Sequence, residues 1–474
     1  MVFSSLIFLF LFLPLSLIAY YFSKNKNWVL LISSMIFYSF GGIKFIYVII
    51  GLTFISYIGG LLVDSSKTNL TRRLSLVGTI SLQLIILILF KYTNFIIDII
   101  NNVSNFDLRV VNIVLPIGIS FYTFQLISYV VDVYREDCEV QKSFAKLLLY
   151  SSLFHQCIAG PIVRYQDIAE QMEYRKVTAG MINRGINRFC IGLAKKAILA
   201  NHLASLADTL LPTTIDGMKT SSVVGLWLGL TMYMLQIYMD FSAYSDMAIG
   251  LGLMVGFKYR ENFDYPYMSK SVSEFWRRWH ISLGSFFRDY VYIPMGGNQL
   301  GLGRTILNLF IVWALTGLWH GAAYNYLLWG LYFFIFITIE KLFASKRVGK
   351  RGKGISHIYL LLVVLFGWLL FRYSDLNLMF GVLKGMFGAG DLPFMDLRTS
   401  LLLQNNVFFI IVAIVGSTAI VKLLDDILSD LSSRYGWIAN VTMTFEVVAM
   451  PVILIVSVIS LVGNSYNPFI YFQF

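Results

Sequence analysis

The chain has 474 residues, of which 57% are hydrophobic and only 13% are charged, and its mean hydropathy is +0.71. A soluble globular protein carries about 25% charged residues, so this composition excludes a soluble enzyme and predicts an all-α, polytopic membrane protein with one integral domain over residues 1–474. The net charge of +11 could indicate a nucleic-acid partner, but cytoplasmic loops rich in Lys and Arg explain it without one, and no nucleic acid is expected.

The N-terminal third is predicted to be a series of membrane-crossing helices. Residues 2–22 form a retained span, because no basic residue precedes them and no small-residue cleavage site follows. Four further apolar segments follow, at residues 28–40, 45–63, 75–100 and 110–133. Basic residues in the loops at 67–73 and 142–146 place these loops on the cytoplasmic side.

The middle of the chain contains two acidic residues within an apolar segment. A span at 147–162 ends at Gly160-Pro161, and residues 183–211 are predicted to form an amphipathic helix along the membrane interface. The apolar run 221–257 contains Asp240 and Asp246, which would cost several kcal/mol if they faced lipid. We expect them to face protein, water or a cavity. A structural role is favoured over contact with an acceptor or a carrier.

Residues 271–290 are predicted to form one amphipathic helix at the membrane surface. Ser271 and Glu274 have the spacing of a capping box, which satisfies free backbone donors at a helix start. Six apolar side chains share one face, namely Trp276, Trp279, Leu283, Phe286, Phe287 and Tyr290. His280 lies at the edge of this aromatic stripe, where support of the helix and participation in catalysis are equally good interpretations.

Two uncharged arms, at 305–319 and 327–339, flank a break. Each arm would be only ~20 Å long, short of the ~30 Å hydrocarbon core, whereas one helix across both would be ~50 Å, which is too long. The sequence therefore predicts a hairpin that breaks at His320-Gly321, with both ends on the inner side because a basic cluster follows at 341–353. An ionisable residue at membrane depth is a functional-site hypothesis by default.

The C-terminal part has three more predicted spans, at 355–371, 407–420 and 441–462, which leave the tail 463–474 outside. Three cysteines, Cys138, Cys157 and Cys190, form no C-x-x-C pair. Neither a disulfide framework nor a metal site is expected. His155, His202 and His357 are interpreted as structural or solvated.

Five motifs resemble those of the membrane-bound O-acyltransferase family: AGPIVRYQDI, QIYMDFSAYSDMAIG, FWRRWHISL, RDYVYIPMGGN and GLWHGAAYNYLLWG. The most similar branch contains the membrane subunit of alginate O-acetyltransferase and its peptidoglycan-acetylating relatives. The likeness covers a core of about residues 115–340 and the C-terminal tail. One departure is Asp264, where the family pattern leads us to expect Asn or another residue.

The resemblance implies a helical funnel of about ten to twelve membrane helices, with re-entrant and interfacial helices added. His320 falls on the family's invariant histidine and His280 on its second motif histidine. An acyl thioester such as acetyl-CoA would arrive from the cytoplasm as a substrate, with no tightly bound cofactor, and the acceptor hydroxyl from the other side. Trp319, Asn325 and Tyr326 are expected to shape the passage.

Three arginines and one C-terminal tyrosine each have two possible roles if the resemblance holds. Arg277, Arg278 and Arg288 could attract the phosphates of coenzyme A or anchor the chain to anionic lipid headgroups. Tyr471, in the tail motif FIYFQF, could relay the acyl group to an extracytoplasmic partner or act as an aromatic interface anchor.

The chemistry assigned to His320 can also be argued without the family. Moving an acyl group from a thioester to an alcohol needs a base for the hydroxyl proton, and neutral imidazole suits that role near neutral pH. The alternative is a helix-breaking histidine that only hydrogen-bonds a neighbouring carbonyl.

The function expected is transfer of an acetyl group from a cytoplasmic thioester across the bacterial cytoplasmic membrane, for O-acetylation of an extracytoplasmic polysaccharide. A secreted or anchored esterase-like transferase would be the partner protein. The alternatives are D-alanyl transfer toward teichoic acids and a non-catalytic transporter of acyl groups or lipids.

Overall fold

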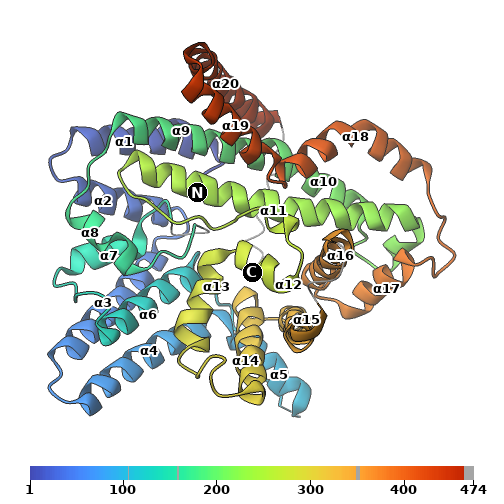
Figure 1. Cartoon of the computed structure of the whole chain (residues 1–474). Coiled ribbons are helices and arrows are strands. Elements are labelled where there is room, and N and C mark those ends of the chain that lie inside the picture. Colours follow the sequence, from blue (N-terminus) through green and yellow to red (C-terminus); the bar gives the residue numbers. More distant parts are fainter. Residues whose placement is uncertain (105, 157–159, 348–352, 464–474) are drawn as a thin grey trace. The chain divides into compact units, whose positions relative to one another are not determined.

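The computed structural model describes residues 1–104, 106–156, 160–347 and 353–463 (Figure 1). These described residues contain helices and loops and no strand, which confirms the predicted all-α class. By length and composition, eight helices in this part of the chain can cross a membrane. They are α3 (Lys44–Ser65), α4 (Asn69–Lys91), α11 (Val223–Met254), α14 (Leu302–His320), α15 (Tyr324–Arg347), α16 (Lys353–Arg372), α18 (Leu397–Gly416) and α20 (Gly436–Gly463). Two shorter apolar helical segments, Phe8–Phe22 and α17 (Leu376–Met386), are also present.

The chain folds into two compact units whose segments alternate along the sequence. The first unit comprises residues 1–189, 245–261 and 285–295. Helix α2 (Lys26–Ser39) turns into α3 at Gly41-Gly42, as predicted. Helix α3 packs against α4 and α6 (Ile119–Arg135), which Figure 1 shows in blue and teal. The shorter helices α7 (Phe144–Ser152) and α8 (Tyr165–Glu173) complete the part of this unit used below.

Three predicted spans of the first unit are wrong in their bounds. The predicted span 75–100 is divided at Tyr92 into α4 and α5 (Thr93–Val103). The predicted span 110–133 becomes helical only at Ile119, because Gly118 has φ 75°, a left-handed conformation that cannot continue a right-handed helix. The helix expected over 147–162 ends at Ser152, where Leu153 leaves the helical region with ψ 113°.

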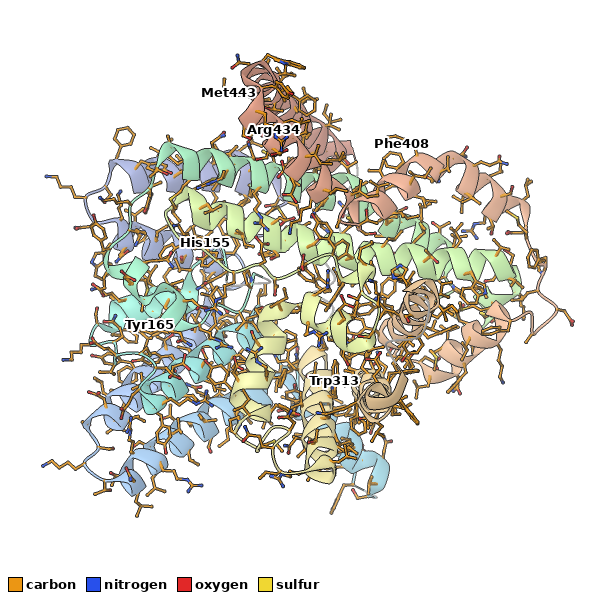
Figure 2. All side chains as sticks on the ribbon, in the orientation of Figure 1. His155, Tyr165, Trp313, Phe408, Arg434 and Met443 are labelled. Atoms are coloured by element: carbon orange, nitrogen blue, oxygen red, sulfur yellow. The ribbon has the colours of Figure 1, made fainter. Side chains whose placement is uncertain are left out.

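The second unit comprises residues 190–244, 262–284 and 296–474. Its core packs α14, α15 and α16 with the short helix α12 (Val272–Arg278), around large buried side chains that include Trp329, Trp368 and Phe333. Helices α14 and α15 approach closely, since a Cβ atom on Gly317 would overlap the carbonyl oxygen of Tyr326. Trp313 on α14, labelled in Figure 2, belongs to this core.

The predicted interfacial helix 183–211 forms as three consecutive helical segments. They are α9 (Ala179–Ala194), the π-helical segment η2 (Lys195–Ala200) and α10 (Asn201–Leu210). The π-helical segment buries the side chain of Lys196, which an entirely interfacial amphipathic helix would have kept in water. Its place at the membrane interface stays a prediction.

Helices α18 and α20 carry exposed apolar side chains, as membrane-spanning helices do. Phe408 on α18 and Met443 on α20 are exposed, and Figure 2 labels both. Helix α18 begins ten residues before the predicted span 407–420, and α19 (Ile420–Arg434) packs against α20. Apolar surface of this kind is stable only against lipid or another apolar partner.

Candidate active site

The hairpin of α14 and α15 positions His320. Helix α14 ends at His320, Gly321 is extended with φ −172° and ψ 155°, and α15 begins at Tyr324, so the predicted break is confirmed. A Cβ atom at position 321 would overlap the ring of Tyr326, which explains a glycine here. The prediction of arms too short to cross is wrong, because α14 with 19 residues and the 20 apolar residues Tyr324–Phe343 of α15 are each long enough to span a membrane.

Aromatic rings surround the His320 imidazole. The side chain is only 6% exposed, and its ring centroid lies 4.9 Å from Trp319, 4.9 Å from Trp329 and 5.4 Å from Phe371. All three rings are nearly perpendicular to the imidazole. Such packing fixes the orientation of a reacting group and limits access of water to it.

Asn325 ties the start of α15 to the end of α16. Its buried amide nitrogen donates to the carbonyl oxygens of Phe371 at 3.2 Å and Leu370 at 3.4 Å. Because Phe371 contacts His320, this tie holds one wall of the aromatic surround in place. The roles of Trp319, Asn325 and Tyr326 along a passage stay predictions.

The helix predicted over 271–290 is interrupted at His280, which corrects the sequence interpretation. The structure has α12, then His280 with φ 45°, then α13 (Ile281–Phe287) and the π-helical segment η5 (Arg288–Tyr292). The loop before α12 forms backbone hydrogen bonds with this segment. The N–H of Ile281 donates to the carbonyl oxygen of Asn262 at 2.9 Å, and the N–H of Asp264 donates to the carbonyl oxygen of Arg278 at 2.9 Å. These bonds take a donor and an acceptor that a continuous helix would have used.

The Ser271 half of the predicted capping box is present at the start of α12, whereas Glu274 bonds the N–H of Lys270 and not that of Ser271. The backbone N–H of Glu274 donates to Ser271 Oγ at 3.1 Å, and Glu274 Oε2 accepts from the N–H of Lys270 at 2.9 Å. A second cap comes from α15, where the Glu340 carboxylate accepts from the N–H of Val272 at 2.6 Å and of Ser273 at 2.9 Å. Glu340 therefore holds α12 against the hairpin that carries His320.

His280 is buried beside the same aromatic group. Its ring centroid lies 5.9 Å from that of Trp319, and its Nδ1 is 3.4 Å from Ser282 Oγ. Burial disfavours the charged imidazolium and lowers the pKa of His280 from 6.5 to about 3. The two motif histidines thus meet the same indole, which the sequence interpretation of one unbroken helix did not anticipate.

Three aromatic residues of the site were missed from the sequence. Trp368 lies 5.0 Å from Trp279, and Trp329 lies 5.4 Å from Trp276, ring centroid to ring centroid. Trp329 belongs to the motif GLWHGAAYNYLLWG, so a signal was available for it. Trp368 and Phe371 lie in an apolar span whose hydropathy looks like that of any other span.

Comparison with known proteins decides the family. The model of the MBOAT, membrane-bound O-acyltransferase family matches residues 6–380. The chain belongs to this family. It is a multi-pass acyltransferase of the bacterial membrane, as its motifs and apolar helices indicated.

Relatives of this acyltransferase include polysaccharide-modifying enzymes. It is 37% identical to a probable alginate O-acetylase of Pseudomonas putida, with 100% of both chains covered. It is 30% identical to a peptidoglycan O-acetyltransferase of Helicobacter pylori, over 82% of this chain and 80% of that protein. A teichoic acid D-alanyltransferase of Bacillus subtilis is 28% identical over 49% of this chain and 60% of its own length.

Two of the three candidate arginines of the acyltransferase have carboxylate partners. Arg278 lies 2.9 Å from Glu274 and 3.7 Å from Asp264, the position that departs from the family pattern. Arg288, in the first unit, lies 2.6 Å from Asp289. Arg277 is exposed. Binding of coenzyme A phosphates or of lipid headgroups by these arginines stays a prediction.

Asp289 also accepts a hydrogen bond from Arg164. Burial alone would raise the pKa of Asp289, but the bonds from Arg288 and Arg164 outweigh burial and hold the pKa below its ordinary value.

Both acids of α11 form ion pairs within their own unit. Asp240 lies 2.8 Å from Lys196 in the second unit, and both side chains are almost fully buried. Asp246 lies 2.9 Å from Arg188 in the first unit. Neither acid faces lipid unpaired, and the pairs have the geometry of structural contacts.

The remaining candidates have partners of their own or lie beyond the described residues. Three histidines each have a polar neighbour: His155 Nδ1 is 2.7 Å from Tyr259 Oη, His202 Nε2 is 2.6 Å from Asn406 Oδ1, and His357 Nδ1 is 2.9 Å from the oxygen of Ser269. Within the described ranges no group of three or more His, Cys, Asp and Glu side chains could hold a metal ion. Tyr471 and Cys157 lie outside the described residues.

Proposed function

We propose that this acyltransferase moves an acetyl group from acetyl-CoA in the cytoplasm to hydroxyl groups of a polysaccharide outside the membrane. The similarity to an alginate O-acetylase over the whole of both chains supports acetyl as the group transferred and a polysaccharide as acceptor. The similarity to the peptidoglycan O-acetyltransferase supports the same transferred group and the same class of acceptor. The observation that carries the proposal is the buried histidine at the helix break, within the residues that the family model matches.

His320 is the base in the proposed reaction. A nitrogen of its imidazole takes the proton of the acceptor hydroxyl as the oxygen attacks the thioester carbonyl carbon. The tetrahedral intermediate collapses, the carbon–sulfur bond breaks, and the proton passes to the departing thiolate. The products are the O-acetyl ester and free coenzyme A, and the imidazole returns to its starting state. The aromatic surround limits water and so disfavours hydrolysis of the thioester.

His280 acts as a positioning residue in this proposal. It contacts the ring of Trp319, and Trp319 contacts His320, so its effect on the reaction is transmitted through an indole. Arg277 is the arginine best able to meet the phosphates of coenzyme A, since Arg278 and Arg288 already have carboxylate partners.

The route of the acetyl group outside the membrane is also proposed. An esterase-like transferase outside the cytoplasm would receive the group, with Tyr471 as the relay residue. Phenol oxygen is the only nucleophile that a Tyr471→Phe change removes. Because that variant lacks the hydroxyl that would first receive the acetyl group, it is expected to lose both acetyl-CoA turnover and polymer acetylation, whereas an aromatic anchor would tolerate the change.

The donor separates this proposal from its alternatives. Purified protein is incubated with acetyl-CoA labelled in the acetyl group, and the release of coenzyme A thiol is followed with and without alginate. Acetyl-dependent thiol release supports the proposal. Turnover of a D-alanyl carrier thioester in place of acetyl-CoA would support teichoic acid modification, and absence of turnover with either donor would favour a transporter.

A further inference from the structure

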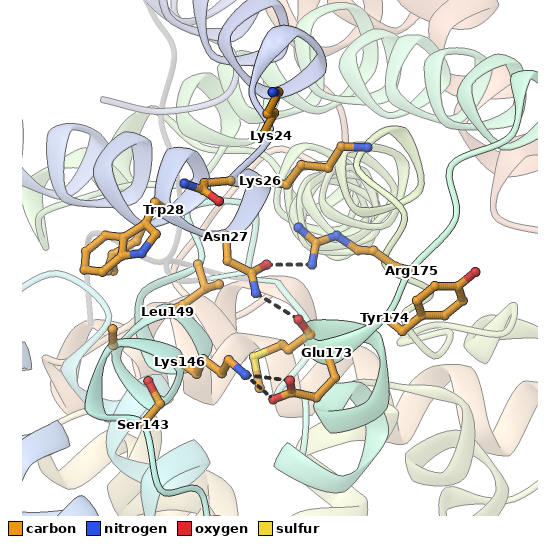
Figure 3. Close-up of a pocket in the computed structure, with 14 residues that line it drawn as sticks. Lys24, Lys26, Asn27, Trp28, Ser143, Lys146, Leu149, Glu173, Tyr174 and Arg175 are labelled. Atoms are coloured by element: carbon orange, nitrogen blue, oxygen red, sulfur yellow. Dashed lines mark hydrogen bonds and ion pairs between the residues drawn. The ribbon is translucent and has the colours of Figure 1, made fainter.

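A basic pocket in the first unit lies outside the catalytic motifs. It has a volume of about 430 Å³ and is formed by the start of α2, the start of α7 and the end of α8 (Figure 3). Four cationic side chains line it, Lys24, Lys26, Lys146 and Arg175, together with a single acid, Glu173. The pocket is therefore positively charged and suits an anion.

Internal partners neutralise only part of this charge. Lys146 Nζ lies 2.7 and 2.5 Å from the two carboxylate oxygens of Glu173, so these two charges cancel. Arg175 Nη1 donates to Asn27 Oδ1 at 2.7 Å, a neutral partner that fixes the guanidinium in the wall (Figure 3). Lys26 lies over the ring of Tyr20, which is also neutral. Three positive charges thus remain without a carboxylate in the pocket lining.

An apolar stripe continues from the pocket along α2. Trp28, which lines the pocket, is 56% exposed, and Ile32 and Ile36 on the same face are 56% and 49% exposed. Trp favours the boundary between headgroups and hydrocarbon, and exposed isoleucines favour acyl chains. The surface therefore passes from a cationic pocket through an indole to an apolar track, which matches a phospholipid from headgroup to tail.

The positive-inside rule predicts that the pocket lies on the cytoplasmic side of the membrane. Lys146, at the start of α7, belongs to the segment 142–146 that the sequence assigns to the cytoplasm, and Lys24 and Lys26 share its pocket. The inner leaflet of the membrane is rich in anionic lipid, and basic pockets between helices on this side bind its headgroups.

We infer that this pocket binds the phosphate of an anionic phospholipid of the inner leaflet, with an acyl chain along Trp28, Ile32 and Ile36. Lys24 and Lys26 attract the phosphate, and Arg175 forms the fixed wall. The inference is independent of the acyl donor and acceptor proposed above, because no residue of the His320 site takes part.

The test compares lipid binding by two charge-matched variants. Purified protein in mild detergent is titrated with fluorescent phosphatidylglycerol and, separately, phosphatidylcholine. The pocket variant Lys24→Gln/Lys26→Gln should bind phosphatidylglycerol about thirtyfold more weakly than the wild type, which corresponds to about 1 kcal/mol for each lysine. The control Lys67→Gln/Arg73→Gln removes two exposed charges that lie on the same predicted side and outside the pocket, and it should bind normally.

Three results would overturn the inference. The first is equal phosphatidylglycerol binding by the pocket variant and the wild type, and the second is an equal loss in the control. The third is displacement of the lipid by millimolar inorganic phosphate, which would indicate a site for a free anion. Thermal unfolding checks that each variant is folded. If the double variant is not, Lys24→Gln alone carries the test, with about a sixfold loss expected.

Discussion

The indole of Trp319 lies between two histidines, with its ring centroid 5.9 Å from that of His280 and 4.9 Å from that of His320. The two imidazoles come from motifs forty residues apart in the chain and contact the same indole. Replacement of either histidine should therefore alter the position of the other imidazole through this indole. The relationship gives His280 a role in positioning that its place on a helix face would not suggest.

Replacement of His280 should lower the rate more than it weakens substrate binding. Asn is the suitable replacement because it tolerates the φ of 45° found here. We expect His280→Asn to reduce kcat about 10- to 100-fold with little change in KM, since the base would be misplaced while the donor site stays intact. Steady-state kinetics with acetyl-CoA test this. His357→Asn is the matched control, and an increase in KM alone would contradict a positioning role.

Acid should destabilise the protein through His280. Its pKa is about 3 when folded against an ordinary value of 6.5, so between these values the unfolded chain binds a proton that the folded chain does not. Stability is complete above pH 6.5 and falls as pH drops toward 3, by up to about 1.4 kcal/mol per pH unit for this one residue. Unfolding in detergent between pH 7.5 and 4.5 measures the slope. His280→Asn should make it shallower by about one proton, and an unchanged slope would refute the assignment.

The close approach of α14 and α15 should depend on Gly317. A methyl group there overlaps the carbonyl oxygen of Tyr326, so Gly317→Ala must separate the helices that hold His320. We expect a loss of about 1–3 kcal/mol in stability and a clear loss of activity. Gly303→Ala, in the same helix with open space around it, is the control. Equal effects of the two substitutions, measured by thermal unfolding and turnover, would show that the helix crossing is not the cause.

The buried pair of Asp240 and Lys196 should be structural. Asp240→Ala removes the carboxylate that faces a buried ammonium and should cost about 3–5 kcal/mol. The double variant Asp240→Leu/Lys196→Met removes both charges and should recover most of that stability, together with activity. Expression yield and thermal unfolding report the first effect. A stable but inactive double variant would instead show that a member of this pair contacts substrate.

The break at His320 could be predicted, whereas the break at His280 could not. The first follows from chain length, because one helix across both apolar arms would be too long for a membrane. At His280 the apolar spacing of Trp279 and Leu283 continues as in one helix, but it is interrupted by the hydrogen bonds that Ile281 N–H donates to Asn262 and that Asp264 N–H donates to Arg278. Partners distant in sequence decide such a break, and hydrophobic periodicity does not record them.

The length of the second apolar arm, predicted over 327–339, was underestimated for a related reason. Glu340 looked like the end of an apolar segment, yet its carboxylate accepts hydrogen bonds from Val272 and Ser273 and lies inside α15. A charge whose partner lies on another helix does not mark the end of its own. The contacts of Phe371 with His320 and of Trp368 with Trp329 were likewise hidden, because both residues come from a span with no distinguishing motif.

The account depends most directly on His320 as the base, and acetyl-CoA turnover by His320→Ala tests it. Because a general base contributes about 10²–10⁴-fold, the rate of coenzyme A release should fall by at least a hundredfold. The unfolding temperature should stay near that of the wild type, and His202→Ala should remain active. Turnover by a folded His320→Ala protein at the wild-type rate would contradict the central claim.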